Sequence, residues 1–178
     1  MWLAFLALAH AEDVAGAWDV LQTEQVTIRC RDEAGERFTC EAVTRIDAAP
    51  DAVWAVVSAP SGYPAVFPRV DAASVRDDGT IDVQFTLPWP LPAWPLRVRP
   101  EADARARRIV LHDVGPGPGV WDQAEVRVVA TDGGSELHWT WHGEHRHAAF
   151  IHRRVQKTYG HDSLWAVAKA VGSEAATP

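Results

Sequence analysis

The chain lacks the sequence signatures of several common chemistries. It has no glycine-rich phosphate loop, no strand-turn-helix motif around a nucleophilic serine and no Cys-x-x-Cys pair, so nucleotide chemistry and nucleophilic catalysis are unsupported. Positive charge is also scarce. The 17 Lys and Arg stand against 24 Asp and Glu, and the net charge of -7 repels nucleic acid. We therefore expect no nucleic-acid partner.

Long hydrophobic runs are missing as well. The most apolar stretch, residues 2–9, is too short to span a bilayer. It leads into Ala9-His10-Ala11, the small-x-small pattern at which signal peptidases cut. We expect residues 1–11 to be a signal peptide, residues 12–173 one domain, and residues 174–178 a tail. The protein is then periplasmic or secreted. Because no Lys or Arg precedes the apolar run, a cytoplasmic protein is the alternative.

Cysteine is nearly absent, since Cys30 and Cys40 are the only two. Both lie five residues from Gly35, so a hairpin that turns at Ala34-Gly35-Glu36 places them opposite each other. In an oxidising compartment the pair is a disulfide candidate. Two buried thiols in a reduced protein are the alternative.

Strand-like alternation of apolar and polar residues occupies most of the chain. The 178 residues, 47% of them hydrophobic, suffice for one sizeable core but not for two comfortable domains. Turn signals separate the alternating segments, which predicts antiparallel hairpins. The predicted strands are 26–31, 37–46, 70–76, 81–87, 96–102, 108–114, 120–131 and 136–146.

Helical spacing appears in three places. After the first hairpin, Asp47 as N-cap and Pro50 as a first-turn residue predict a short helix, and a second short piece covers residues 63–67. From 148 to 171 apolar residues recur every three or four positions, which predicts a long terminal helix interrupted at Gly160. The recurring residues are Ile151, Val155 and Tyr159, followed by Trp165, Ala168 and Val171. This order predicts an α+β fold in which a curved antiparallel sheet wraps the terminal helix. The gap between them is a place for an apolar ligand.

Several short strings resemble, in order along the chain, the START-type lipid-transfer domains of the helix-grip (SRPBCC) superfamily, which also includes polyketide cyclases and the birch-pollen allergen. Residues 43–57 resemble the superfamily's first strand and helix. Residues 61–70 resemble its second helix, and residues 150–155 resemble the start of its lid helix. Those closer to START domains are Gly16-Ala17-Trp18-Asp19-Val20, Leu87-Pro88-Trp89-Pro90-Leu91 and Leu96-Arg97-Val98-Arg99. The last string departs from the Arg-Asp pair that the family usually carries after its proline-rich loop. The resemblance covers residues 16–171 and implies a START-like helix-grip domain.

The resemblance further implies a tunnel for a sterol, phospholipid, fatty acid, quinone or polyketide-like ligand, gated by the proline-rich loop and the last helix. Residue alternation predicts which side chains line it. The candidates are Val83, Phe85, Leu87, Leu111, Trp139 and Trp141 on strands, and Ile151, Val155 and Tyr159 on the helix. Burying any one of them is worth roughly 1.5–3 kcal/mol, so each could equally serve as ordinary core.

The loop from Pro88 to Pro95 carries Trp89, Leu91 and Trp94. Its four prolines argue against a central strand, so we expect a structured apolar loop. Because an exposed apolar patch tends to mark an interaction site, the two indoles could anchor the mouth of the tunnel on a membrane during transient contact. The alternative is that both rings fold back as a plug over the core.

Charged residues near the predicted tunnel suggest two roles. Arg97 or Arg99 could clamp a carboxylate or phosphate head group. Catalysis would need an ionisable group with a shifted pKa inside the tunnel, and the candidates Asp113, Glu125, His145 and Arg99 form no recognisable pair. The prediction is therefore non-enzymatic binding, with transfer, of an apolar small molecule. The alternative is a polyketide cyclase or aromatase-like enzyme.

Five histidines gather near the last strand and the start of the terminal helix: His138, His142, His145, His147 and His152. Alternation places His138 and His142 on the solvent face, opposite Trp139 and Trp141, so the five do not converge as metal ligands must. Their spacing also matches no standard zinc pattern. We expect no metal, no cofactor and a monomer.

Overall fold

A computed structural model of the protein describes residues 17–86, 93–115, 121–144 and 149–174; within these ranges, the side chains of residues 35, 149–153 and 173–174 are not described. The described strands form one antiparallel sheet of nine, in the order β1-β2-β3-β9-β8-β7-β6-β5-β4. Their bounds are β1 (Asp19–Gln22), β2 (Val26–Asp32), β3 (Arg37–Ile46), β4 (Val70–Val75), β5 (Ile81–Phe85), β6 (Trp94–Asp103), β7 (Arg108–Asp113), β8 (Gln123–Thr131) and β9 (Gly134–Glu144).

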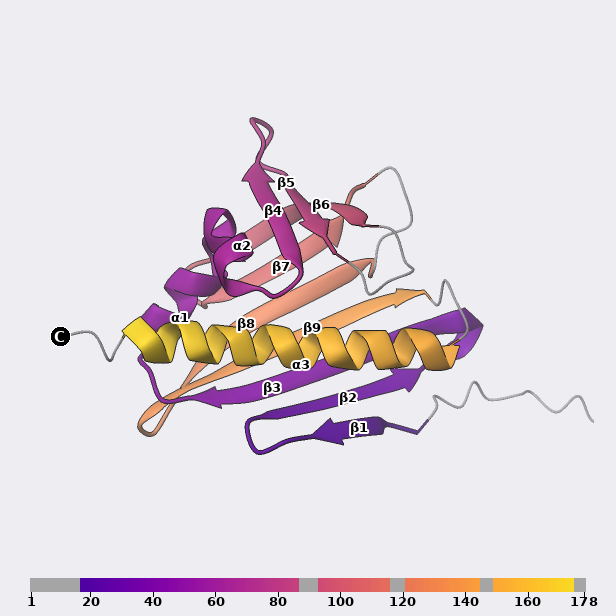
Figure 1. The fold of residues 1–178 in the computed structure, drawn as a ribbon, viewed down its shortest axis with the longest axis horizontal. Helices are drawn as coiled ribbons and strands as arrows, with labels where there is room; N and C mark the ends of the chain where they lie inside the picture. The colour runs from indigo at the N-terminus through magenta and orange to yellow at the C-terminus, as the bar shows by residue number, and fades with distance from the viewer. Residues whose placement is uncertain (1–16, 87–92, 116–120, 145–148, 175–178) are drawn as a thin grey trace, which may run out of the picture.

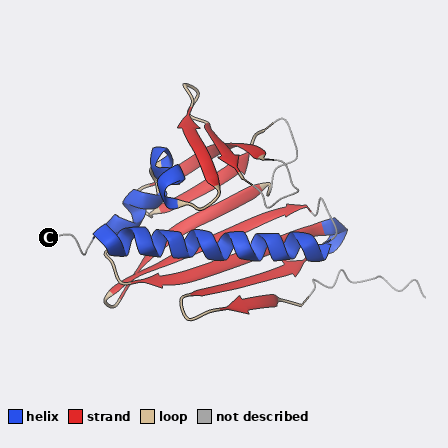
Figure 2. Ribbon diagram, in the orientation of Figure 1, coloured by secondary structure: helices blue, strands red, loops and turns tan. Residues whose placement is uncertain are grey.

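The helices are α1 (Pro50–Val57), α2 (Tyr63–Val66) and α3 (Ala149–Glu174), with short 3-10 turns η1 (Ala34–Glu36) and η2 (Pro60–Gly62). After β3, the segment α1-η2-α2 carries the chain to the far edge of the sheet, where β4 begins. Successive strands then return until β9 pairs with β3. The three α-helices lie on the same face of the sheet, with α3 running across it (Figures 1 and 2).

This architecture confirms the predicted α+β helix-grip fold. All eight predicted strands are present, with ends that differ by a few residues. The first strand, β1, was missed because its four residues show no alternation: three are exposed and one is partly buried. None of the described helices has the length and apolar character needed to cross a membrane.

Two local predictions about helices were wrong. The N-cap of α1 is Ala49 rather than Asp47, and Pro50 occupies the first turn as expected. Helix α3 continues through Gly160 without interruption. A Cβ atom at Gly160 would lie 2.7 Å from Cη2 of Trp141 and 3.1 Å from Cδ1 of Ile28. The missing side chain therefore lets α3 lie close against the sheet.

The core lies between α3 and the inner face of β2, β3 and β9. Alternate residues of β2 point inward, and Val26, Ile28 and Cys30 are fully buried. Leu164 and Val167 of α3 are buried among the same cluster of core residues. The other half of the sheet, from β8 to β4, extends beyond α3 toward α1 and α2 (Figure 1).

Candidate functional site

An apolar cavity of about 90 Å³ lies between the inner face of the sheet and the helices. This volume is several times what one water molecule needs. Its strand walls are Val70, Val83, Phe85, Leu96, Val98, Leu111, Val126, Leu137 and Trp139. Its remaining walls are Val57, Tyr63, Phe67, Trp121, Ser163, Leu164 and Val167. Helices α1, α2 and α3 therefore all contribute to it.

A second cavity of about 30 Å³ adjoins the sheet beside the first half of α3. Its walls are Phe85, Trp121, Trp139, Trp141, Gln156, Tyr159 and Gly160. Three aromatic residues, Phe85, Trp121 and Trp139, border both cavities. The two spaces are therefore neighbours that share these three residues in their walls.

The predicted tunnel residues divide between the two cavities. Val83 and Leu111 line the larger one, Trp141 and Tyr159 line the smaller one, and Phe85 and Trp139 line both. Val155 is partly buried and belongs to neither wall. Leu87 and the side chain of Ile151 lie outside the described residues.

The walls made by α1, α2 and the second half of α3 were not predicted. In α3, the sequence interpretation took Trp165, Ala168 and Val171 as the inward stripe, but Trp165 is 40% exposed. The buried stripe is Leu164, Val167 and Val171. Its first two residues each lie one position before the predicted ones, and Val171 is common to both. The buried stripe also has helical spacing, so the sequence contains a signal for it. The prediction missed it because Trp165 was assumed to be buried.

Polar groups inside the site are few. The Nε1 of Trp141 donates to Oε1 of Gln156 over 2.8 Å, and the hydroxyl of Tyr63 donates to the carbonyl of Val57 over 2.9 Å. Burial raises the pKa of Tyr63 to about 12. The Nε1 of Trp139 is buried and has no hydrogen-bond partner in the part of the chain that the structure describes. Trp139 also packs against Trp141, with ring centroids 5.0 Å apart.

The arginines predicted to hold a head group lie away from the cavities. In β6 the inward positions are Leu96 and Val98, so Arg97 and Arg99 point to the outer face. Arg97 Nε donates to Oδ1 of Asp82 over 2.6 Å, and Arg99 is exposed. The sequence interpretation assigned these residues to the wrong face of the strand, and neither borders a described cavity.

The acid-base candidates Glu125 and Asp113 have partners outside the cavity walls. Glu125 pairs with Arg108 over 2.7 Å on the outer face, and this hydrogen bond lowers the pKa of the Glu125 carboxyl. Asp113 accepts a hydrogen bond from the backbone of Gly115. His145 lies outside the described residues. None of the described candidates borders either cavity.

The predicted gate loop is described only in part. Trp89 and Leu91 lie outside the described residues. Trp94 begins β6, where it pairs with Phe85, so it belongs to a strand rather than to a loop. Pro95 follows it in the same central strand, which the sequence interpretation had excluded; a proline is tolerated at the beginning of a strand. Trp94 borders a groove with Asp82 and Arg97 rather than either cavity.

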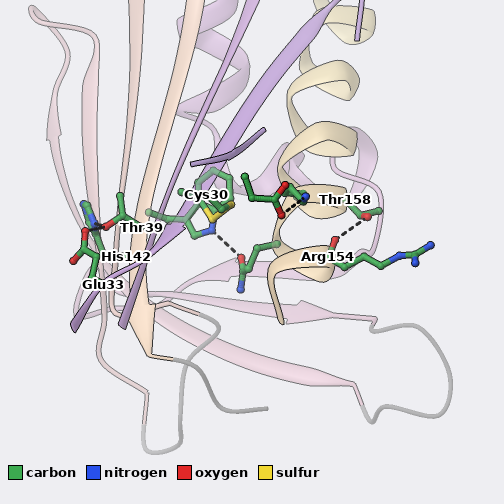
Figure 3. Close-up of a disulfide and its surroundings, with 11 residues drawn as sticks. Cys30, Glu33, Thr39, His142, Arg154 and Thr158 are labelled. Carbon is green, nitrogen blue, oxygen red and sulfur yellow. Dashed lines mark hydrogen bonds and ion pairs between the residues drawn. A yellow bond between two sulfur atoms is a disulfide. The ribbon is translucent and has the colours of Figure 1, made fainter. Parts of the chain in front are cut away.

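Cys30 and Cys40 form a disulfide between directly opposed residues of β2 and β3 (Figure 3). On the opposite face of β3, Thr39 donates a 2.6 Å hydrogen bond to Glu33 and lies 2.9 Å from Nδ1 of His142. This face is the solvent face on which His142 was expected. Among the described residues, no three His, Cys, Asp or Glu side chains converge as a metal site would require.

Comparison with known proteins identifies the family to which the chain belongs. The chain belongs to the polyketide cyclase / dehydrase and lipid transport family, whose model matches residues 37–171. A search of curated proteins found no match.

Solved structures share the fold at low sequence identity. A STAR-related lipid transfer protein from Xanthomonas axonopodis is 14% identical, with a TM-score of 0.68, covering 86% of this chain and 98% of that one. The Zhui aromatase/cyclase from a Streptomyces species is 19% identical, with a TM-score of 0.61, covering 78% and 93%. A START superfamily protein from Mycobacterium smegmatis is 10% identical, with a TM-score of 0.65, covering 76% and 97%. Both lipid-transfer and cyclase proteins therefore share this architecture.

Proposed function

We propose that the protein binds an apolar small molecule between the sheet and α3 without changing it chemically. The observation that carries this proposal is the composition of the walls. Among the described residues, the ionisable side chains that border the two cavities are Tyr63 and Tyr159. Burial raises the pKa of Tyr63 to about 12 and also raises that of Tyr159. An acid or base that acts near neutral pH needs a pKa near that pH, so these walls favour binding over proton transfer.

The alternative function is a polyketide cyclase or aromatase-like enzyme, which the breadth of the family supports. Such an enzyme would need an acid or base other than the two tyrosines of the walls. Of the predicted candidates, His145 lies outside the described residues, and Asp113 and Glu125 border neither cavity. The described chemistry of the site therefore favours a carrier.

The size of the site indicates how a ligand would be accommodated. A typical ligand site has a volume of roughly 300–1,000 Å³, whereas the larger cavity measures about 90 Å³. Displacing the rings of Phe85, Trp121 and Trp139 would join this space to the smaller cavity. The ligand thus enters by separating aromatic side chains. Transfer to a membrane extends this proposal, and substitution of Trp89, one of the two predicted indole anchors, tests it.

Native mass spectrometry of the protein purified from its expression host tests the proposal. We expect a bound mass that organic extraction removes. Val83→Phe, which fills the wall of the larger cavity, should reduce the bound fraction. Val75→Phe is the matched control, because Val75 is 59% exposed on the edge strand β4 and should leave the bound fraction unchanged.

Incubation of the emptied protein with the extracted molecule separates the two functions. A carrier should rebind the molecule and return it unchanged. Binding of neutral apolar molecules should also vary less than about twofold between pH 5 and pH 9, because a wall without groups that titrate in this range has no charge to change. Chemical conversion of the molecule, or a steep pH dependence of binding, would favour the cyclase alternative.

A further inference from the structure

The indole nitrogen of Trp139 stands out among the polar atoms of the site. Its Nε1 is buried and has no hydrogen-bond partner among the described residues, although Trp139 borders both cavities. An indole N–H can only donate. Leaving such a donor buried and unpaired costs about 1–3 kcal/mol. The Trp139 side chain, which borders both cavities, therefore carries a donor that no described residue satisfies.

The neighbouring polar groups do not share this property. Trp141 Nε1 donates to Gln156, the hydroxyl of Tyr63 donates to the carbonyl of Val57, and that of Tyr159 donates to the carbonyl of Thr86. None of these acceptors serves Trp139. Of the buried side-chain polar atoms that lack a partner among the described residues, only the Trp139 nitrogen belongs to a residue that borders the cavities.

The walls also restrict the charge of the ligand. The described residues that border the cavities include no Asp, Glu, Lys, Arg or His. A carboxylate or phosphate buried there would lack a counter-charge, and burying an unpaired charge is far more costly than burying a hydrogen-bonded neutral oxygen. A ligand that fits these walls is therefore uncharged where it lies inside them.

We propose that Trp139 Nε1 donates a hydrogen bond to an oxygen of the ligand, and that the ligand is an uncharged apolar molecule with a carbonyl or similar oxygen acceptor. This inference rests on the proposed function and narrows its ligand class, since it disfavours fatty-acid carboxylates and phospholipid head groups inside the cavity. The nitrogen is covered by its neighbours, so the Trp139 ring has to move before the donor can reach a ligand.

Two small probe molecules, a cyclic ketone and the matching hydrocarbon, test this proposal. The ketone 1-tetralone and the hydrocarbon tetralin share a fused-ring skeleton and differ by one carbonyl oxygen. Trp139→Phe should weaken binding of 1-tetralone by about threefold to tenfold, the fold-change expected from the loss of one hydrogen bond. Binding of tetralin should change less than about twofold, because it makes no hydrogen bond. Trp165→Phe is the control, since Trp165 is exposed on α3 and should alter neither affinity.

A spectroscopic measurement on the unmodified protein does not depend on the folding of a variant. With ¹⁵N-labelled tryptophan, 1-tetralone should move one indole N–H resonance downfield, and tetralin should not. The anion 1-naphthoate, which has a similar ring system, should bind at least about tenfold more weakly than 1-tetralone, because the walls hold no cation to pair with its carboxylate.

The outcomes distinguish a failure of the Trp139 hydrogen bond from a failure of apolar binding itself. Equal losses of affinity for both probes in Trp139→Phe, or indole resonances that respond alike to both probes, would overturn the hydrogen bond and leave apolar binding intact. Tight binding of 1-naphthoate would overturn the uncharged ligand class. If the unmodified protein binds neither tetralin nor 1-tetralone, the proposed function fails, and this inference fails with it.

Discussion

The hydroxyl of Tyr159 in α3 donates a 2.8 Å hydrogen bond to the backbone carbonyl of Thr86, directly after β5. The Tyr159 ring also contacts Phe85 edge to face, with centroids 6.2 Å apart. Phe85 borders both cavities and Tyr159 borders the smaller one. The terminal helix is thus tied to the sheet beside the candidate ligand site.

Removal of the hydrogen bond between Tyr159 and Thr86 should destabilise the end of β5. Tyr159→Phe is expected to lower the free energy of unfolding by roughly 0.5–1.5 kcal/mol, the net worth of one hydrogen bond. Amide hydrogen exchange around Thr86 should become faster. Tyr63→Phe is the matched control: it removes a 2.9 Å bond to the carbonyl of Val57 and should leave exchange around Thr86 unchanged. Unaltered exchange in Tyr159→Phe would show that the contact does not hold the strand.

A methyl group at Gly160 should disturb the contact between α3 and the sheet. Its Cβ would lie 2.7 Å from Cη2 of Trp141, a side chain that is 2% exposed and has little room to move. We expect Gly160→Ala to lower the free energy of unfolding by about 1–3 kcal/mol, as overpacking does. Urea unfolding monitored by circular dichroism measures this change.

Gly172→Ala is the control for the same substitution in the same helix. Apart from the adjacent backbone of α3, no atom of the described residues lies within 4 Å of a Cβ built at Gly172, so the helix preference of alanine should stabilise the protein by up to about 1 kcal/mol. Opposite signs for the two variants are therefore expected. A stabilising effect of Gly160→Ala would contradict the close approach of α3 to Trp141.

The parts of this fold that could be predicted from sequence depend on local pattern. The strands with one buried face alternate visibly, as in Ile81 and Val83, and Cys30 and Cys40 could be paired because they are equally far from a turn. The exposed strand β1 carries no such signal. Trp165 misled the phase of α3 because its large apolar ring lies outside, where Lys169 Nζ lies 4.8 Å from the ring centroid.

The candidate site was less predictable because packing between distant segments determines it. Val57 and Tyr63 come from helices that the chain folds over the sheet, and no spacing rule relates them to Leu111 or Trp139. The faces of β6 were assigned incorrectly because Arg97 was chosen for its chemistry rather than for its place in the alternation. The unpaired nitrogen of Trp139 depends on the positions of all its neighbours, so no sequence signal marks it.

The disulfide should stabilise the sheet beneath α3. Cys30 and Cys40 are fully buried and 10 residues apart. Replacing both with alanine is expected to lower the free energy of unfolding by about 2–4 kcal/mol, the usual contribution of such a bond. Alkylation in denaturant should add no label without reductant and two labels with it, as mass spectrometry can measure. Two labels without reductant would show that the thiols are free in the purified protein.

The buried hydroxyl of Tyr63 should make stability fall in alkaline solution. Its pKa is raised to about 12 by burial, from 10.0 in the unfolded chain. Below pH 10 both states keep the proton, so its contribution is fully present. Between about pH 10 and pH 12 the unfolded state loses the proton first and is favoured, by about 1.4 kcal/mol for each pKa unit of difference. Stability should therefore decrease as pH rises through this window.

Comparison with Tyr63→Phe isolates this effect from the other groups that titrate at high pH. The variant lacks the hydroxyl, so its free energy of unfolding should fall less between pH 10 and pH 12 than that of the unmodified protein. The difference between the two should approach about 2–3 kcal/mol at the upper end, because two pKa units separate the folded and unfolded states. Urea unfolding at several pH values measures both proteins. Parallel stability curves would mean that the Tyr63 hydroxyl ionises as easily in the folded protein as in water, which is incompatible with its place in the cavity wall.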